Sequence, residues 1–150
     1  MNKSNYIKQA LKSANIQIKE LTKIKKVFNK SYVKAIDAIL HCKGKVILAG
    51  IGKSGLIARK ISATLSSVGV PSFFCDPAQA LHGDMGQIEK KDVVIIFSYS
   101  GNTSELTNMI KYCNRYRIKV IGVASKPDSL LLTASDIKSI IPKVKESDTT

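Results

Sequence analysis

The chain has 150 residues, 44% of them hydrophobic and 23% charged, which suits a single globular domain. It contains neither an apolar run of about 20 residues nor an apolar N-terminal core, so we expect no membrane span or secretory signal. Cys42, Cys75 and Cys113 are widely spaced in apolar or helical contexts. They are expected to be reduced thiols of a cytoplasmic protein, with no disulfide and no metal.

The net charge of +13 raises the possibility of a nucleic-acid partner. Lysines make up 21 of the 24 basic residues, and the only arginines are Arg59, Arg115 and Arg117. Arginine is the residue that best recognises phosphates and bases with two hydrogen bonds, so its scarcity weakens this possibility. Eleven lysines fall at helical spacing in residues 1–45. They indicate a solvated helix face, and we expect no nucleic-acid partner.

Two helices are predicted before the first strand, over 4–28 and 31–41. Neither contains glycine or proline, and the first carries an apolar stripe at spacings of three and four or their sum. The stripe consists of Ile7, Leu11, Ala14, Ile18, Leu21 and Phe28. Such a stripe must pack on this domain or on a second copy of it. Residues 1–43 are therefore expected to be a packing or oligomerisation segment.

From residue 45 the pattern changes to strands that alternate with helices. Near-continuous β-branched runs separated by helices predict a parallel sheet covered on both faces. The expected fold is α/β, a three-layer α/β/α sandwich over 44–150 with a five-stranded parallel sheet, preceded by the N-terminal helices. The predicted strands are 45–50, 71–76, 92–98, 118–125 and 137–144, and the predicted helices are 54–68, 104–116 and 128–134.

The turn after the first strand, in "VILAGIGKSG", contains Gly50, Gly52 and Gly55. These match the G-x-G-x-x-G fingerprint of dinucleotide-binding domains, and Asp76 near the end of the second strand could hold a ribose. A Lys-Ser pair before the third glycine and a proline after Asp76 count against this interpretation without excluding it. The P-loop motif does not fit, because Ile47 stands where that motif needs glycine.

The turn after the third strand, "SYSGNTSE" over 98–105, places four hydroxyls around one glycine at the start of a predicted helix. Hydroxyl donors, free backbone amides and the positive end of a helix dipole together favour an anion. Either Thr103 or Ser104 is expected to cap the helix, but a cap uses one hydroxyl rather than four. Because ligands bind at the carboxyl ends of parallel strands, a single sugar phosphate could lie between the two turns.

The segments "GIGKSG", "PSFFCDPAQALHGDMG", "FSYSGNTSE" and "KVKES" resemble, in order and spacing, the sugar isomerase (SIS) domain of arabinose 5-phosphate isomerases of the KdsD/KpsF type. The resemblance implies interconversion of D-arabinose 5-phosphate and D-ribulose 5-phosphate through an enediolate, which supplies the precursor of Kdo for lipopolysaccharide or capsule synthesis. It also implies a cytoplasmic homo-oligomer, dimer or tetramer, that needs no cofactor. The alternatives are a phosphosugar-binding module without turnover and, less favoured, a dinucleotide-binding oxidoreductase domain.

The resemblance also implies roles for individual residues. The phosphate would be bound by Gly52, Ser54, Ser98, Ser100, Gly101 and Thr103, and catalysis would involve Lys53, His82, Glu105 and Glu146. Each catalytic candidate also has an ordinary structural or surface interpretation. Tyr99 stands where the family usually has Asn or Gln. The family continues with a further histidine and closing helices, and many members add CBS domains, so 44–150 is expected to be an SIS domain that is incomplete at its C-terminus, with no CBS domain.

Overall fold

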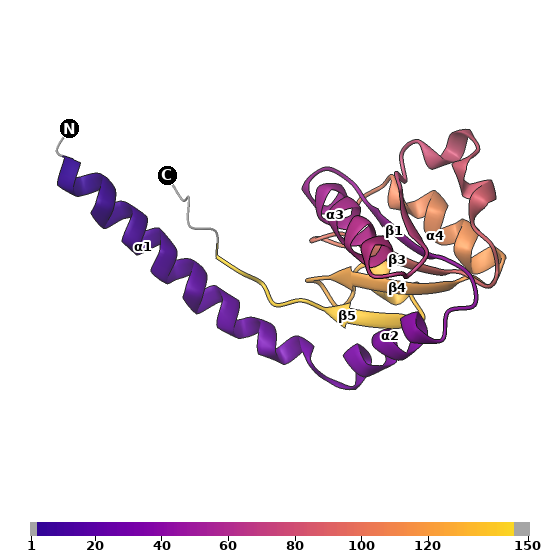
Figure 1. Cartoon of the computed structure of the whole chain (residues 1–150), viewed down its shortest axis with the longest axis horizontal. Coiled ribbons are helices and arrows are strands. Elements are labelled where there is room, and N and C mark those ends of the chain that lie inside the picture. The colour runs from indigo at the N-terminus through magenta and orange to yellow at the C-terminus, as the bar shows by residue number, and fades with distance from the viewer. Residues whose placement is uncertain (1–2, 146–150) are drawn as a thin grey trace.

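The computed structural model of the chain describes residues 3–145. Its five strands form a single parallel sheet, in the spatial order β2-β1-β3-β4-β5 (Figure 1). The predicted five-stranded parallel sheet is therefore confirmed. The strands are β1 (Val46–Gly50), β2 (Ser72–Cys75), β3 (Val93–Phe97), β4 (Lys119–Ala124) and β5 (Ile137–Ile140).

Helices cover both faces of the sheet, because alternate residues of each strand point to opposite faces. On one face, β1 places Val46 and Leu48 in a core shared with α2 and α3. On the other face, Ile47 and Ala49 belong to a core shared with α4 and α5. The predicted three-layer sandwich is thus confirmed. The helices are α2 (Lys30–Leu40), α3 (Lys53–Ser67), α4 (Leu106–Arg115) and α5 (Leu130–Thr133).

The irregular stretch between β2 and β3 contains two short 3-10 helices, η2 (Ala80–His82) and η3 (Asp84–Gln87). Ala80 and Ile88 anchor this stretch in the core on the α4 side of the sheet. The segment is therefore packed on the domain, although it forms neither a strand nor an α-helix.

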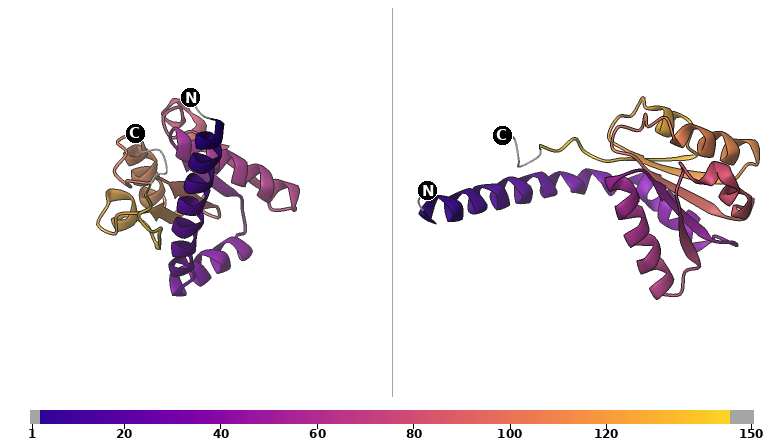
Figure 2. Two further views of the ribbon diagram at one scale, coloured as in Figure 1. Left: turned by 90° about the vertical axis from the view of Figure 1, so that its left-hand side faces the viewer. Right: turned by 90° about the horizontal axis from the view of Figure 1, so that it is seen from above.

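The N-terminal segment differs from the prediction. The expected helix over 4–28 is divided into α1 (Lys3–Thr22) and a 3-10 helix, η1 (Lys23–Val27). Asn29 then starts α2, since its side-chain oxygen accepts hydrogen bonds from the amides of Ser31 and Tyr32 at 2.8 and 3.4 Å. Helix α1 projects from the domain as a long arm (Figures 1 and 2).

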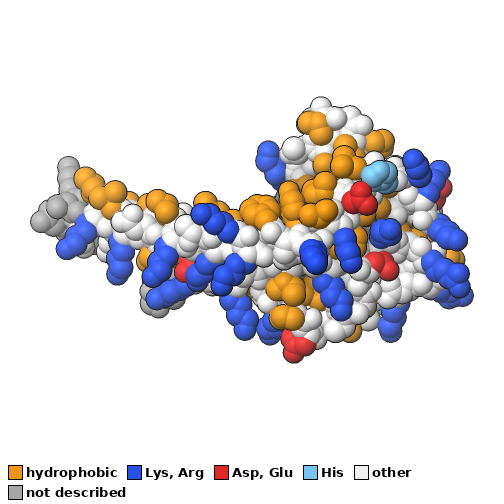
Figure 3. All heavy atoms as spheres, turned by 90° about the horizontal axis from the view of Figure 1, so that it is seen from below, with side chains coloured by type: hydrophobic (Ala, Val, Ile, Leu, Met, Phe, Trp, Pro, Cys, Tyr) orange, Lys and Arg blue, Asp and Glu red, His pale blue; other side chains and the backbone are white. Residues whose placement is uncertain are grey.

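The apolar stripe of α1 is not buried by the rest of the described chain. Four of its side chains are more than 60% exposed: Ile7, Leu11, Ile18 and Leu21. In the space-filling view, apolar side chains follow the arm and continue onto the domain (Figure 3). The sequence left two surfaces on which this stripe could pack, its own domain or a second copy of the chain. Packing on its own domain is wrong for the described residues, and packing on a second copy stays a prediction.

Two other predicted elements are longer than the observed ones. Strand β5 ends at Ile140 rather than at residue 144. The Ile141 amide still donates to the Ala124 carbonyl at 2.9 Å, but the next residue is Pro142, which has no N–H to continue the ladder. Helix α5 is shorter than the predicted 128–134 and begins at Leu130, after the N-cap Ser129, whose hydroxyl accepts from the Leu132 amide.

Cys42, Cys75 and Cys113 are free thiols in the structure. Burial in the core raises the pKa of Cys75 to about 11 and that of Cys113 to about 12. Within residues 3–145 no cluster of His, Cys, Asp or Glu could hold a metal ion. No helix in the same range is both long and apolar enough to cross a membrane.

Asp92 joins the start of the sheet to the loop that precedes β3. Its side chain is buried and accepts hydrogen bonds from the amides of Lys45 at 2.7 Å and Glu89 at 2.8 Å. The Lys45 ammonium lies 3.3 Å from the same carboxylate. This carboxylate therefore satisfies two backbone donors at the amino ends of β1 and β3, where the ladder cannot supply acceptors.

Asp92→Ala should lower the free energy of unfolding by about 2–4 kcal/mol, because two part-buried hydrogen bonds to backbone amides and an ion pair with a lysine are lost. Asp92→Asn keeps one acceptor oxygen and should lose less. Urea denaturation of both variants measures the difference. The exposed Asp128→Ala is the control and should change stability by no more than about 0.5 kcal/mol. An Asp92→Ala protein as stable as this control would contradict the assignment.

Candidate functional site

The site lies where the order of the strands reverses. Strands β1 and β3 are neighbours, but the chain leaves β1 toward β2 and leaves β3 toward β4, on the other side. Open parallel sheets bind ligands at this point, beyond the carboxyl ends of the two strands. A pocket of about 360 Å³ occupies the position. It is lined by Ile51, Lys53, Ser54, Phe97, Ser98, Tyr99, Ser100 and Thr103.

The first wall of the pocket is the turn from β1 into α3. Gly52, at φ 57°, turns the chain just before the helix begins at Lys53. A Cβ on Gly55 would lie 2.6 Å from the Gly50 carbonyl oxygen, so α3 can approach β1 this closely only with glycine there. The G-x-G-x-x-G spacing thus follows from the packing of α3 on β1 and needs no dinucleotide to explain it.

This turn leaves hydrogen-bond donors directed at the pocket. In the described chain, the first amide of α3 with a backbone acceptor is that of Gly55, which donates to the Ile51 carbonyl at 3.3 Å. The amides of Lys53 and Ser54 have no acceptor among residues 3–145, as expected for the first turn of a helix. With the helix dipole behind them, these amides favour an anion.

The second wall is the turn after β3. The Ser98 hydroxyl is buried, accepts from the Gly101 amide at 3.0 Å and lies 2.9 Å from the Thr103 hydroxyl. The Ser100 hydroxyl accepts from the Asn102 amide at 3.3 Å. Gly101 has φ 70°, and any side chain there would overlap the Ser129 hydroxyl. The turn is therefore fixed by its own hydrogen bonds before any ligand binds.

The hydroxyls of this turn still have donors to offer. A serine hydroxyl has one donor and can accept twice. When Ser98 accepts from both Gly101 and Thr103, its own O–H remains for a ligand, and when it donates to Thr103, the Thr103 O–H remains. The Ser100 O–H has no acceptor among the described residues in either arrangement, because Ser100 only accepts within the turn.

The expected hydroxyl cap on α4 is not formed. The helix begins at Leu106, two residues later than predicted, and Glu105 precedes it without a side-chain cap. Thr103 is engaged by Ser98, and the Ser104 hydroxyl donates to the Glu105 carboxylate at 2.8 Å. The hydroxyls of Thr103 and Ser104 therefore form hydrogen bonds within the turn instead of capping α4.

Lys53 and Glu105 differ in how far their charges are already engaged. Lys53 is exposed at the pocket and forms no ion pair with any described carboxylate. Glu105 is exposed outside the lining of the pocket, and hydrogen bonds from its own amide and from Ser104 hold its pKa below the ordinary value. Glu105 is therefore ionised at neutral pH, with its negative charge already stabilised.

One predicted catalytic residue, His82, is not brought to this pocket. His82 is exposed on η2 and does not line it, and Glu146 lies outside the described residues. Asp76, the candidate ribose ligand, accepts from the Ala78 amide at 3.0 Å within its own turn. Sequence analysis missed Ile51 and Phe97 as lining residues, although both directly flank the motif residues at the ends of β1 and β3.

The amino-acid sequence is similar to those of several curated bacterial proteins. It is 44% identical to the arabinose 5-phosphate isomerase GutQ of Escherichia coli K12 over 77% of this chain, and 39% identical to the arabinose 5-phosphate isomerase KdsD of Shigella flexneri over 85%. An uncharacterised Rickettsia prowazekii protein is 42% identical over 98% of the chain. The chain spans 36%, 39% and 46% of these three relatives, less than half of each.

Solved structures share the fold over nearly the whole chain. An E. coli CFT073 protein in complex with arabinose 5-phosphate has a TM-score of 0.93 and 33% identity, over 99% of this chain and 79% of its own. A candidate sugar-phosphate isomerase from Listeria monocytogenes gives 0.93 and 31%, over 99% and 78%. The family model for the SIS domain matches residues 39–150. The chain therefore belongs to the SIS domain family, in the branch that includes the arabinose 5-phosphate isomerases GutQ and KdsD.

Proposed function

We propose that this chain binds D-arabinose 5-phosphate and D-ribulose 5-phosphate and carries the site of an aldose–ketose isomerase that interconverts them. The observation that supports this most directly is the pocket between the two turns, in which unpaired helix amides face a cluster of serine and threonine hydroxyls. The arabinose 5-phosphate complex of the similar E. coli protein agrees with the proposed ligand. The pathway proposed for the product is Kdo and lipopolysaccharide synthesis, in the cytoplasm.

The phosphate would occupy the space between the start of α3 and the turn after β3. The donors available there are the amides that follow Gly52 and the hydroxyls of Ser54, Ser98, Ser100 and Thr103, while Gly101 gives the second turn its shape. Several donors from a fixed turn suit a dianion, because no reorganisation is needed when it binds.

Isomerisation moves a proton between neighbouring carbons and passes through an enediolate with negative charge on oxygen. Lys53 is the cation available in the pocket to stabilise that charge. Glu105 and Glu146 are the proposed groups for proton transfer. His82 lies outside the pocket of a single chain, so its proposed role would require that another copy supply it.

A phosphosugar-binding module without turnover is the second candidate function. It is favoured by the fact that the described pocket combines its phosphate donors with only one catalytic candidate, Lys53. A coupled assay for ribulose 5-phosphate on the purified chain separates the two, since a module binds the sugar phosphate and releases it unchanged.

Arabinose 5-phosphate and ribulose 5-phosphate should raise the melting temperature, whereas NAD and NADP should not. A ligand that binds only the folded state adds about 2.7 kcal/mol of stability at a hundredfold excess over Kd.

Ser54→Ala should weaken pentose phosphate binding by about 1–3 kcal/mol, because its hydroxyl lines the pocket and has no partner within the described chain. Isothermal titration measures this loss.

Ser67→Ala, at the far end of the same helix, is the matched control, because its hydroxyl bonds only to the Thr64 carbonyl. Its affinity for pentose phosphates should equal that of the parent. Stabilisation by NAD without any by pentose phosphates would contradict the proposed function. Equal affinity in Ser54→Ala and Ser67→Ala would place the phosphate elsewhere.

The pKa of Glu105 should rise toward its ordinary value in Ser104→Ala, because the carboxylate loses a hydrogen bond that stabilises its charged form. The parent carboxylate therefore stays ionised to lower pH than the variant does. If Glu105 must be ionised for turnover, the acid limb of the pH–rate profile moves upward in the variant. Carbon-detected NMR titration of Glu105 measures the pKa directly, and an unchanged value would contradict this account.

We also propose that a second copy of the chain covers the exposed stripe of α1, which makes the protein a homo-oligomer. A helix whose apolar face meets only water would lose about 25 cal/mol for every Å² left unburied. Leu11→Ser with Ile18→Ser should shift the protein toward the monomer in sedimentation velocity. Lys8→Ser with Lys12→Ser, on the polar face of the same helix, should not. A monomeric parent chain would overturn this proposal.

A further inference from the structure

Residues 141–145, here called the strap, leave β5 and run back beside α1 (Figures 1 and 2). Two consecutive strap amides are held by different elements of the chain. The Val144 amide donates to the Tyr99 hydroxyl at 3.2 Å, and the Lys145 amide donates to the Glu20 carboxylate at 3.1 Å. Tyr99 belongs to the pocket turn and Glu20 to the N-terminal arm, so the strap connects these two parts.

Glu20 is an unusual residue for its surroundings. It is the only acidic residue among the first 36, which include nine lysines. Its side chain is only 13% exposed, although the apolar stripe of the same helix is open to solvent. Hydrogen bonds from Lys23 and from the Lys145 amide hold its pKa below the ordinary value. The contact with the strap is thus made by the one carboxylate available in this stretch.

The half-buried residues of α1 lie on one side of the helix. Ser13, Ile16 and Glu20 are partly covered, at spacings of three and four, and Lys23 of η1 continues the same side. This side is different from the exposed stripe that contains Leu11 and Ile18. The arm therefore has one face directed to its own strap and another left for a partner.

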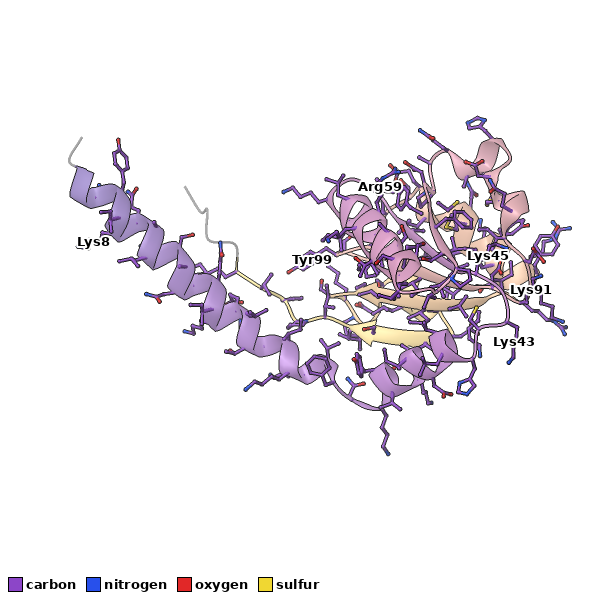
Figure 4. The ribbon with its side chains drawn as sticks, in the orientation of Figure 1. Lys8, Lys43, Lys45, Arg59, Lys91 and Tyr99 are labelled. Carbon is purple, nitrogen blue, oxygen red and sulfur yellow. The ribbon has the colours of Figure 1, made fainter. Side chains whose placement is uncertain are left out.

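Tyr99 is held at both its main chain and its side chain. Its carbonyl oxygen accepts from the amide and the hydroxyl of Ser125, at 2.9 and 2.7 Å, while its own hydroxyl accepts from Val144. In the stick view Tyr99 projects from the carboxyl edge of the sheet beside the strap (Figure 4). Since Tyr99 lies between Ser98 and Ser100 in the pocket turn, a restraint on its side chain is also a restraint on that turn.

We propose that Tyr99 and Glu20 are positioning residues that hold the strap against the pocket turn, so that the N-terminal arm contributes to the geometry of the substrate site. The consequence for ligand binding rests on the proposed function, whereas the contact itself does not.

Amide hydrogen exchange, followed by NMR on the full chain, tests the contact. Tyr99→Phe removes only the acceptor of Val144, and Glu20→Ala removes the acceptor of Lys145. Each should speed exchange of its own amide roughly two- to tenfold, which is the net worth of one such hydrogen bond. Glu20→Gln should restore much of the protection, because an amide oxygen can still accept.

Both control residues lie away from the strap, and the tyrosine control also matches Tyr99 in exposure. Tyr116→Phe is the control for Tyr99→Phe, because Tyr116 is 50% exposed and Tyr99 is 48% exposed. Glu89→Ala is the control for Glu20→Ala, and Glu89 lies on the loop before β3. Neither should change exchange at Val144 or Lys145. Unchanged exchange in Tyr99→Phe and Glu20→Ala would overturn the proposed contact.

Affinity for arabinose 5-phosphate tests the positioning role. The Tyr99→Phe, Glu20→Ala double variant should bind it roughly two- to tenfold more weakly than the parent, because a less restrained turn must be ordered on binding. The Glu20→Gln, Tyr116→Phe and Glu89→Ala proteins should bind as the parent does. Faster exchange with unchanged affinity would overturn the positioning role. Failure of the parent to bind any pentose phosphate would overturn the proposed function, and the exchange rates would then decide on the contact alone.

Discussion

The contact between Gly55 of α3 and Gly50 of β1 sets the position of everything at the site. With no Cβ between them, the start of α3 lies directly on the end of β1, and its first amides face the pocket. Any side chain at Gly55 would push the helix outward, because the Gly50 carbonyl is 2.6 Å from where the Cβ would be. The neighbouring strand β3 delivers the hydroxyl turn to the same edge, and the parallel sheet keeps the two turns opposite each other.

The site combines many neutral hydrogen-bond donors with few charged groups. Lys53 is its one described cation, and the remaining donors are neutral amides and hydroxyls. Fixed neutral donors cost little desolvation when an anion binds, whereas a cluster of lysines would repel one another until the ligand arrived. The +13 net charge of the chain is thus carried mostly outside the pocket, on surfaces such as the arm, rather than by the residues that line it.

The arm and the strap show how distant segments depend on one another. Helix α1 has an apolar stripe that the described chain leaves uncovered and a second face that meets the strap through Glu20. The strap in turn reaches the pocket turn through Tyr99. The hydrogen bond between Glu20 and the strap helps to place this helix, since its exposed apolar stripe contributes little to its orientation within one chain.

The sequence by itself determined the sheet and both turns that line the pocket, because buried parallel strands need uninterrupted β-branched runs and each turn needs glycine and hydroxyls at fixed positions after its strand. It also led to the correct family. The tertiary structure decided which catalytic candidates meet: Lys53 lines the pocket, whereas His82 lies on η2 outside it. It also decided that Pro142 ends β5 early, and that Tyr99 and Glu20 meet the strap across 45 and 125 residues of sequence. Local patterns predict local structure, but contacts this distant depend on how the whole chain packs, which no spacing of residues records.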